Sequence, residues 1–482
     1  MNYITVDLGS TNIKVGLFNE KLRCLEYKSS AVKYIRNHAF VEFDADLYAQ
    51  TVMDLIRDLK ATEISQIIFT GQAESLVMLD NACKPLCNAI SWMDERSTAQ
   101  CIEISNYFTV RTCHATTGQQ AILPTWPASK ILWLRENRPE IFNKVETYVL
   151  LKDYLIFLFT GKMVADKSIA TFSLYFDIFR GCYWNDMLDF IGISLKQLPP
   201  LTEPCTVVGT LTAKAASLMR LSESVKVNIG TLDHFSGMIG VGNVSKGIVS
   251  YSTGTVMALA TIADKKINKN CSVALHYGFI PDSLVMLPVA ESGGICLQWY
   301  RDHFMKGVPF LDIDEELKNR TLPNDLIFLP YLVGSNAPEF DKDMCGLFYG
   351  MRTETDEYDL AYAVMEGVAH LLKKNCDAIE RAGTKIRYII ATGGGAKSPA
   401  WCQLQASLTG VEVRVPYEKE ASCFGSAIIG AVSDGIFKSY QTAATAVKFS
   451  HIYKPVLNEK LNTKHLIFNT LYENCRQLRR II

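Results

Sequence analysis

The chain has 482 residues, and its 49 Lys and Arg residues are balanced by 50 Asp and Glu residues, giving a formal net charge of −1. This length exceeds that of a typical single hydrophobic core and predicts two domains. The charge balance, without a long block of like charge, disfavours a nucleic-acid-binding or membrane-surface tail.

The sequence also predicts a cytoplasmic protein. No apolar run has the length of a membrane-spanning helix, because Lys152 and Asp153 interrupt the nearest one, 148–159. A β-rich segment follows Met1 directly and leaves no room for a signal peptide. The fourteen cysteines stand singly, without metal-binding spacing, so we expect reduced thiols.

The predicted elements of the first half begin with two strands, 3–9 and 13–19, joined by a tight Gly-Ser-Thr turn. A helix is expected over 44–62, with Asp44 as its N-cap, and a buried strand follows at 65–72. Further along, the pattern predicts a helix over 127–142, and a strand that runs into a turn over 226–234.

The second half of the sequence repeats this arrangement of predicted elements. A hairpin is expected over 247–262, with Ser-Thr-Gly-Thr at its turn, and a long amphipathic helix over 357–383. A strand, a glycine-rich turn and a helix follow over 385–410. Because each half begins with a hairpin that has a small-residue turn, the pattern indicates a weak internal duplication, and we place the boundary near Asn243.

Three turns of small residues are candidates for phosphate binding. The first is in VDLGSTNIK (6–14), where backbone N–H groups, hydroxyls and a lysine gather beside an aspartate. The second is STGT (252–255), and the third is ATGGGAKSPAW (391–401), which precedes a helix N-terminus. None of them has the GxGxxG or GxxxxGK[ST] pattern.

The segment NIGTLDHFSGMIGVGNV (228–244) places Asp233 and His234 in a run of small and apolar residues. Asp233 could cap the helix that follows the strand. Alternatively, it could be a catalytic base at a cleft where the chain passes close to a substrate.

With these motifs in this order, the chain resembles the FGGY carbohydrate kinases of the actin-like ATPase superfamily. The resemblance runs from residue 3 to about residue 435. Besides the first turn, it is carried by the segments 71–97, 130–142, 152–166, 230–242, 346–367, 393–401 and 421–431. It implies an α/β fold of two ribonuclease-H-like domains around a central cleft. Residues 1–243 would form the sugar-binding domain and residues 244–482 the ATP-binding domain.

The resemblance also implies the roles of individual residues. Asp233 would be the general base, and Asp7 would hold Mg²⁺ through water. The residues implied to contact ATP are Ser10, Thr11, Lys14, Gly254, Thr255, Gly294, Gln298, Gly394, Gly395, Ala396 and Lys397. The residues implied to contact the acceptor are Gln72, Ala73, Glu74, Trp92, Asp94, Arg96 and His234.

The acceptor segment departs from the family pattern. After Gly-Gln, xylulose kinases typically carry Met-His and glycerol kinases Arg-Glu, whereas this chain has Ala73-Glu74. Glu74 either accepts hydrogen bonds from sugar hydroxyls or is an exposed turn residue. His234 either contacts the substrate or is a packed, hydrogen-bonded histidine.

The sequence therefore predicts an ATP- and Mg²⁺-dependent kinase that phosphorylates a primary hydroxyl of a small ketose, such as xylulose, or of a polyol. The alternatives are a glycerol or other polyol kinase of this family, a sugar-independent actin-like ATPase, and a catalytically silent sugar sensor. No nucleic-acid or membrane partner is expected, and a homodimer is left open. The identity of the acceptor and the carbon that is phosphorylated are also left open.

Overall fold

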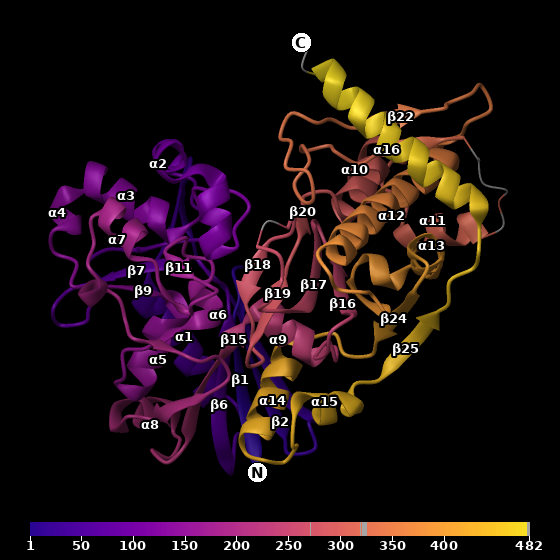
Figure 1. The fold of residues 1–482 in the computed structure, drawn as a ribbon. Coiled ribbons are helices and arrows are strands. Elements are labelled where there is room, and N and C mark those ends of the chain that lie inside the picture. The colour runs from indigo at the N-terminus through magenta and orange to yellow at the C-terminus, as the bar shows by residue number, and fades with distance from the viewer. Residues whose placement is uncertain (270, 319, 321–324, 480–482) are drawn as a thin grey trace.

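The computed structural model describes residues 1–269, 271–318, 320 and 325–479, and two large β-sheets organise the fold (Figure 1). In spatial order, the first sheet consists of β3 (Cys24–Ala31), β2 (Asn12–Asn19), β1 (Asn2–Leu8), β6 (Ile64–Gly71), β15 (Lys226–Leu232) and β14 (Val207–Thr210). The second consists of β18 (Leu275–Tyr277), β19 (Ser283–Met286), β17 (Met257–Asp264), β16 (Ile248–Thr253), β23 (Tyr388–Gly393), β24 (Glu412–Pro416) and β25 (Phe449–Tyr453), with β20 (Val289–Ala290) paired to β17.

The two sheets share one strand pattern. From β3 to β14, neighbouring strands pair antiparallel, antiparallel, parallel, parallel and antiparallel. From β19 to β25, the same senses recur in the same order. The internal duplication predicted from the two hairpins is therefore present as a repeated sheet topology, and the α/β prediction is confirmed.

Helices cover both sheets, and a smaller sheet extends the first half. On the first half lie α1 (Ala45–Arg57), α2 (Thr98–Thr117), α5 (Leu151–Thr160) and α8 (Ala213–Met219). On the second half lie α10 (Gly294–Phe304), α11 (Phe310–Lys318), α12 (Glu357–Arg381), α13 (Pro399–Thr409) and α16 (Glu459–Arg479). The smaller sheet contains β4 (Ile35–Asn37), β5 (Phe40–Phe43), β8 (Ala89–Ile90), β7 (Leu76–Leu79) and β9 (Thr147–Leu150).

Most predicted elements are present, and their ends have local causes. The carboxylate of Asp44 accepts a hydrogen bond from the backbone N–H of Leu47 at 2.9 Å, so it caps α1 as predicted. The helix predicted over 127–142 is divided into α3 (Pro127–Asn137) and α4 (Pro139–Phe142), because proline restricts the residue before it and lacks the N–H that would continue the helix.

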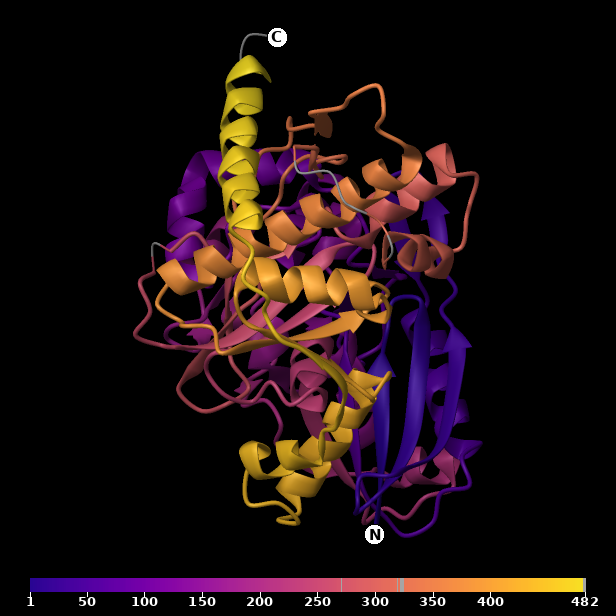
Figure 2. The same cartoon turned by 90° about the vertical axis from the view of Figure 1, so that its right-hand side faces the viewer.

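A helix from the second half packs on the first sheet. This helix, α14 (Ala421–Ser433), lies beside β1 and β6 and crosses α9 (Asp233–Gly240) (Figures 1 and 2). A Cβ atom on Gly430 would lie 2.8 Å from side-chain atoms of both Tyr3 and Ile68, so any larger residue would force these side chains to shift. The core of the first half thus includes residues that follow Asn243 in the sequence. The domain boundary near Asn243 stays a prediction.

Asp434, directly after α14, fixes this helix to the first sheet. Its carboxylate accepts hydrogen bonds from Ser65 and Gln66 of β6 and pairs with the ammonium of Lys226 on β15. Within the described residues, none of the helices is sufficiently long and apolar to cross a membrane.

Candidate active site

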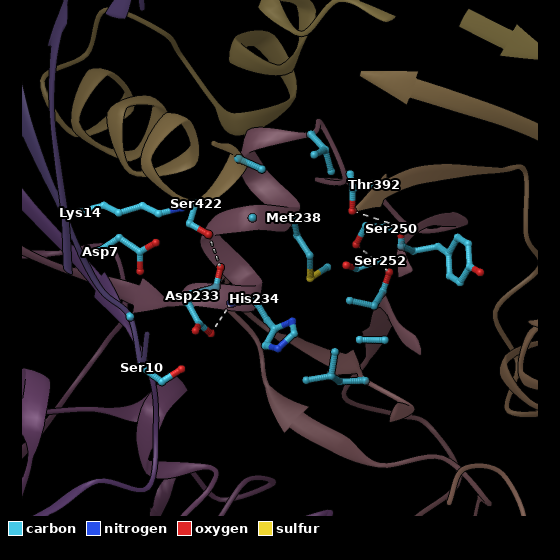
Figure 3. A pocket seen from close by; sticks show the side chains of 18 of the residues that line it. Asp7, Ser10, Lys14, Asp233, His234, Met238, Ser250, Ser252, Thr392 and Ser422 are labelled. Atoms are coloured by element: carbon cyan, nitrogen blue, oxygen red, sulfur yellow. Dashed lines mark hydrogen bonds between the residues drawn. The ribbon is translucent and has the colours of Figure 1, made fainter. Parts of the chain in front are cut away.

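A cavity of about 400 Å³ opens between the two sheets. Figure 3 shows Asp7, Ser10 and Lys14 on one side, Ser250, Ser252 and Thr392 on the other, and Asp233 with His234 between them. The cavity thus brings together the first phosphate turn, the segment of Asp233 and the strand ends of the second sheet.

The first phosphate turn joins β1 to β2 and contributes Ser10, Thr11 and Lys14 to the cavity wall, where the resemblance places them. The ammonium of Lys14 forms an ion pair with the carboxylate of Glu420, which directly precedes α14. The sequence offered no signal for this pair, because its members lie 406 positions apart.

Asp7 lies near the end of β1, and its Oδ1 atom is buried without a hydrogen-bond partner in the described part of the chain. Burial, together with the nearby charge of Asp233, raises the pKa of Asp7 to about 7, although Lys14 opposes the shift. Lys14 therefore only partly offsets the effects of burial and of Asp233 on this carboxyl group, which lies at the wall of the cavity.

Asp233 is the first residue of α9, and Leu232 occupies the N-cap position. Its Oδ1 atom accepts the backbone N–H of His234 at 2.6 Å. No side-chain capping bond closes α9, so the structure does not use Asp233 as a cap. The half-buried carboxylate and the exposed His234 both line the cavity.

The crossing of α9 and α14 determines where Asp233 stands. A Cβ atom on Gly240 would lie 2.0 Å from the carbonyl oxygen of Ala421, and one on Gly425 would lie 1.8 Å from that of Ser236. Both glycines permit the two backbones to approach closely. The contact therefore packs α9, which begins with Asp233, directly against α14, which follows Glu420.

The predicted nucleotide residues of the second half lie in three adjoining segments. The backbone N–H of Gly294, at the start of α10, donates to the carbonyl of Gly254 at 2.7 Å, and Ile295 donates to Thr255 at 3.2 Å. Gly395 packs against the side chain of Thr253. The start of α10 is therefore bonded to the turn 254–255, and the turn at Gly395 lies against Thr253 beside it. Gln298 lies one helical turn further along α10, and Gly394, Ala396 and Lys397 adjoin Gly395.

None of these nucleotide residues is among the cavity-lining residues. The second half lines the cavity instead with Ser250, Ser252 and Thr392. Ser252 and Thr392 belong to the second and third candidate phosphate turns, but none of the three was predicted as an individual ATP contact. A signal was present, since Ser250 and Ser252 alternate with the buried Tyr251 along β16, and such alternation places both hydroxyls on one face of the strand.

The predicted acceptor residues other than His234 also lie outside the cavity lining. Asp94 is fully buried, and the guanidinium of Arg96 donates to Asp94 and Glu42 and lies 4.4 Å from the ring centre of Phe40. These contacts occupy both charged groups within the protein. A direct contact of Asp94 or Arg96 with the acceptor stays a prediction, as does one of Ala73 or of Trp92, whose side chain is 37% exposed.

Glu74 follows β6 in a left-handed backbone conformation with a φ of 68°, which is uncommon outside glycine. Its Oε2 atom is buried and has no hydrogen-bond partner in the described part of the chain. Burial raises the pKa of Glu74, and the ammonium of buried Lys130 opposes the shift. Lys130 itself donates to the backbone carbonyls of Glu74 and Ser91 at 3.0 and 2.8 Å.

Comparison with known proteins places this architecture in a family. The N-terminal domain of the FGGY family of carbohydrate kinases matches residues 2–240, and the C-terminal domain of that family matches residues 248–433. The chain belongs to the FGGY family of carbohydrate kinases. The resemblance seen in its motifs is confirmed, and the chain is an ATP-dependent sugar kinase.

Individual FGGY relatives are similar along nearly the whole length. The xylulose kinase of Bacillus subtilis (strain 168) is 28% identical over 492 residues, which cover 99% of this chain and 98% of that protein. The gluconokinase of Bacillus licheniformis is 27% identical, with 93% of this chain and 91% of that protein covered. The crystal structure of ligand-bound xylulose kinase from Lactobacillus acidophilus has a TM-score of 0.90 and 25% identity, with 99% and 98% of the two chains covered.

Proposed function

We propose that this kinase transfers the γ-phosphoryl group of ATP to a primary hydroxyl of a small neutral ketose or polyol, with a xylulose-like ketose as the first choice. The observation that carries the proposal is the pair of carboxylates, Asp7 and Asp233, which face one cavity between the first phosphate turn and the second sheet. Phosphoryl transfer needs this combination of a base for the acceptor and negative groups that favour a cation.

Asp233 would take the proton of the attacking hydroxyl. The N–H of His234 already donates to its Oδ1 atom, which leaves Oδ2 for the acceptor. The short helix α9 fixes the carboxylate at the cavity wall, so little rearrangement is needed when the hydroxyl arrives. His234 would contact the acceptor from the adjacent position.

Asp7 would hold Mg²⁺, through water as the family resemblance implies. The unpartnered buried Oδ1 atom of Asp7 fits this role, because an oxygen of a carboxylate is a ligand type that Mg²⁺ prefers. The described residues contain no cluster of three or more metal-binding side chains, so water and phosphate would supply the other ligands. When bound, the ion neutralises negative charge on the phosphates.

The remaining predicted ATP contacts surround this centre. Lys14, Ser10 and Thr11, together with the turn of Gly254 and Thr255, would face the phosphates. The start of α10 would contact the nucleotide, and the turn 394–397 would line the adenosine site. Closure of the two halves would exclude water, which otherwise competes with the sugar as acceptor.

Glu74 supports a neutral acceptor. The unpartnered Oε2 atom of Glu74 suits a sugar hydroxyl. In its ionised form, which the ammonium of Lys130 favours against burial, the carboxylate would repel an acidic sugar such as gluconate. The chain is nearly equally identical to the xylulose kinase and to the gluconokinase, at 28% and 27%, so this residue chemistry decides our preference.

The test is a panel of acceptors: xylulose, other ketoses, aldoses, glycerol, sugar alcohols and gluconate, each incubated with MgATP. We expect one neutral acceptor to raise the rate of ADP release by about 100-fold or more, with formation of its phosphate ester. ADP release that ignores every sugar would overturn the kinase proposal in favour of an ATPase. A response to gluconate alone would contradict only the neutral acceptor.

The pKa of Asp7 predicts a pH dependence. Below its pKa of about 7 the carboxyl group is protonated and offers no charge to a cation. The kcat/KM for MgATP should therefore fall by about tenfold per pH unit as the pH drops below this value, and level off above it. Rates measured from pH 5.5 to 8.5 test this expectation. If the acidic limb persists unchanged in Asp7→Asn, another group causes it.

We also propose the cytoplasm as the compartment, which the lack of any disulfide among the fourteen cysteines supports within the described residues. A homodimer stays a prediction.

A further inference from the structure

The first phosphate turn is tied to the acceptor segment by hydrogen bonds that are buried or partly buried. Gly9 is one of the residues that line the cavity. Its carbonyl oxygen accepts hydrogen bonds from the hydroxyl of Tyr48 at 3.0 Å and from the side-chain amide of Gln72 at 3.3 Å. The backbone N–H of Gln72 also donates to the carbonyl of Leu8 at 3.1 Å. Two elements, α1 and the end of β6, therefore hold the same point of the turn.

The bonds continue towards the acceptor segment. The Oε1 atom of Gln72 accepts the hydroxyl of Ser75 at 3.0 Å, and the oxygen of this hydroxyl accepts the backbone N–H of Trp92 at 3.1 Å. Gln72 is 6% exposed and Ser75 is fully buried, so the chain of bonds is shielded from water. The side chains of Gln72 and Ser75 each donate once and accept once, so the bonds run in one direction from Trp92 through Ser75 and Gln72 to Gly9.

The side chain of Tyr48 is held in this position by its surroundings. The residue is 4% exposed, and its ring packs against Phe43 with 5.6 Å between ring centres. Burial raises the pKa of Tyr48 well above its usual value, so its hydroxyl stays protonated and donates to Gly9. The rest of the turn is tight, because a Cβ atom on Gly9 would lie 2.3 Å from the carbonyl oxygen of Asn12.

We infer that Gln72 and Tyr48 are positioning residues, which hold the phosphate turn through the Gly9 carbonyl, and that Ser75 connects this turn to the backbone of Trp92. The inference rests on the proposed function and deepens it: the turn that faces ATP and the segment that faces the sugar move as one unit. It gives Gln72 a role other than the direct acceptor contact predicted from the sequence.

The experiment compares Tyr48→Phe, Gln72→Met, the double variant, and Tyr154→Phe as a matched control. Tyr154 is also a buried tyrosine that donates to α1, at Asp46, but it does not contact the phosphate turn. Initial rates with MgATP and the acceptor found in the panel give kcat and both KM values. Calorimetric titration with MgATP, and urea unfolding, complete the comparison.

We expect Tyr48→Phe and Gln72→Met each to lower kcat by about tenfold, while the KM for the acceptor changes by less than about twofold. The double variant should lose much less than the product of the two effects, because both bonds act on one carbonyl oxygen. Tyr154→Phe should retain kcat, even if its free energy of unfolding falls as much as that of Tyr48→Phe.

Three results would overturn the inference. They are an unchanged kcat in the folded variants, a loss of kcat in Tyr154→Phe equal to that in Tyr48→Phe, and a change in Gln72→Met confined to the KM for the acceptor. If the wild-type protein phosphorylates no sugar, the proposed function fails separately. The positioning role is then decided by the dissociation constant for MgATP, expected to rise by about threefold or more in Tyr48→Phe and not in the control.

Discussion

Asp233→Asn should lower kcat for sugar phosphorylation by about 10²–10⁴-fold, the range expected when a general base is lost. An amide cannot take the proton of the attacking hydroxyl at neutral pH. It can still accept the N–H of His234, which donates to the Oδ1 atom of Asp233, so the start of α9 should be preserved. The measurement is the initial rate of formation of the phosphate ester with saturating MgATP.

The control for this variant is Asp264→Asn at the exposed end of β17, where the aspartate forms a surface ion pair with Lys246. We expect this control to retain kcat within about twofold, as surface ion pairs contribute little. Calorimetry should show that Asp233→Asn still binds MgATP. If Asp233→Asn retained more than a tenth of the wild-type kcat, Asp233 would not be the base.

The second large effect concerns stability. Gly240→Ala should lower the free energy of unfolding by about 3 kcal/mol, because the added methyl group overpacks the crossing of α9 and α14. Its Cβ atom would lie 2.0 Å from the carbonyl oxygen of Ala421 and 2.9 Å from the backbone nitrogen of Gly425. Both neighbours are backbone atoms, so neither helix can make room without moving as a whole. Urea unfolding followed by circular dichroism measures the change.

Gly237→Ala is the matched control on the same helix. The nearest atom to its added Cβ is the hydroxyl oxygen of Ser422 at 3.9 Å, an ordinary contact. Alanine is favoured over glycine inside a helix by about 0.5–1 kcal/mol, so this variant should be as stable as the wild type or slightly more stable. Equal destabilisation of both variants would show that helix α9 tolerates no side chain at either position, and would refute the crossing as the cause.

Much of the fold was predictable because its signals are local. The Gly-Ser-Thr turn after β1, the N-cap at Asp44 and the alternation of small and apolar residues around Asp233 depend on neighbours within a few positions. Backbone conformation and capping are decided at this range. The same turn also carried the family resemblance, and with it the expected position of Lys14 at the cavity wall.

The rest depends on partners that lie far away in the sequence. A residue type shows that a group needs a counter-charge or a hydrogen bond, but not which distant residue provides it. Arg96 resembles a ligand in the sequence, whereas the fold places its guanidinium between Asp94 and Glu42. For the same reason, neither the pair of Lys14 with Glu420 nor the bond from Tyr48 to Gly9 could be foreseen.

The packing of α14 on the first sheet also has a consequence for synthesis on the ribosome. A chain is made from its N-terminus, and early domains commonly fold while later ones are still being translated. Here the face of β1 and β6 that receives Gly430 cannot be covered before residue 430 has left the exit tunnel. The nascent first half therefore carries an uncovered apolar face until α14 has been made, and exposed surface of this kind favours aggregation.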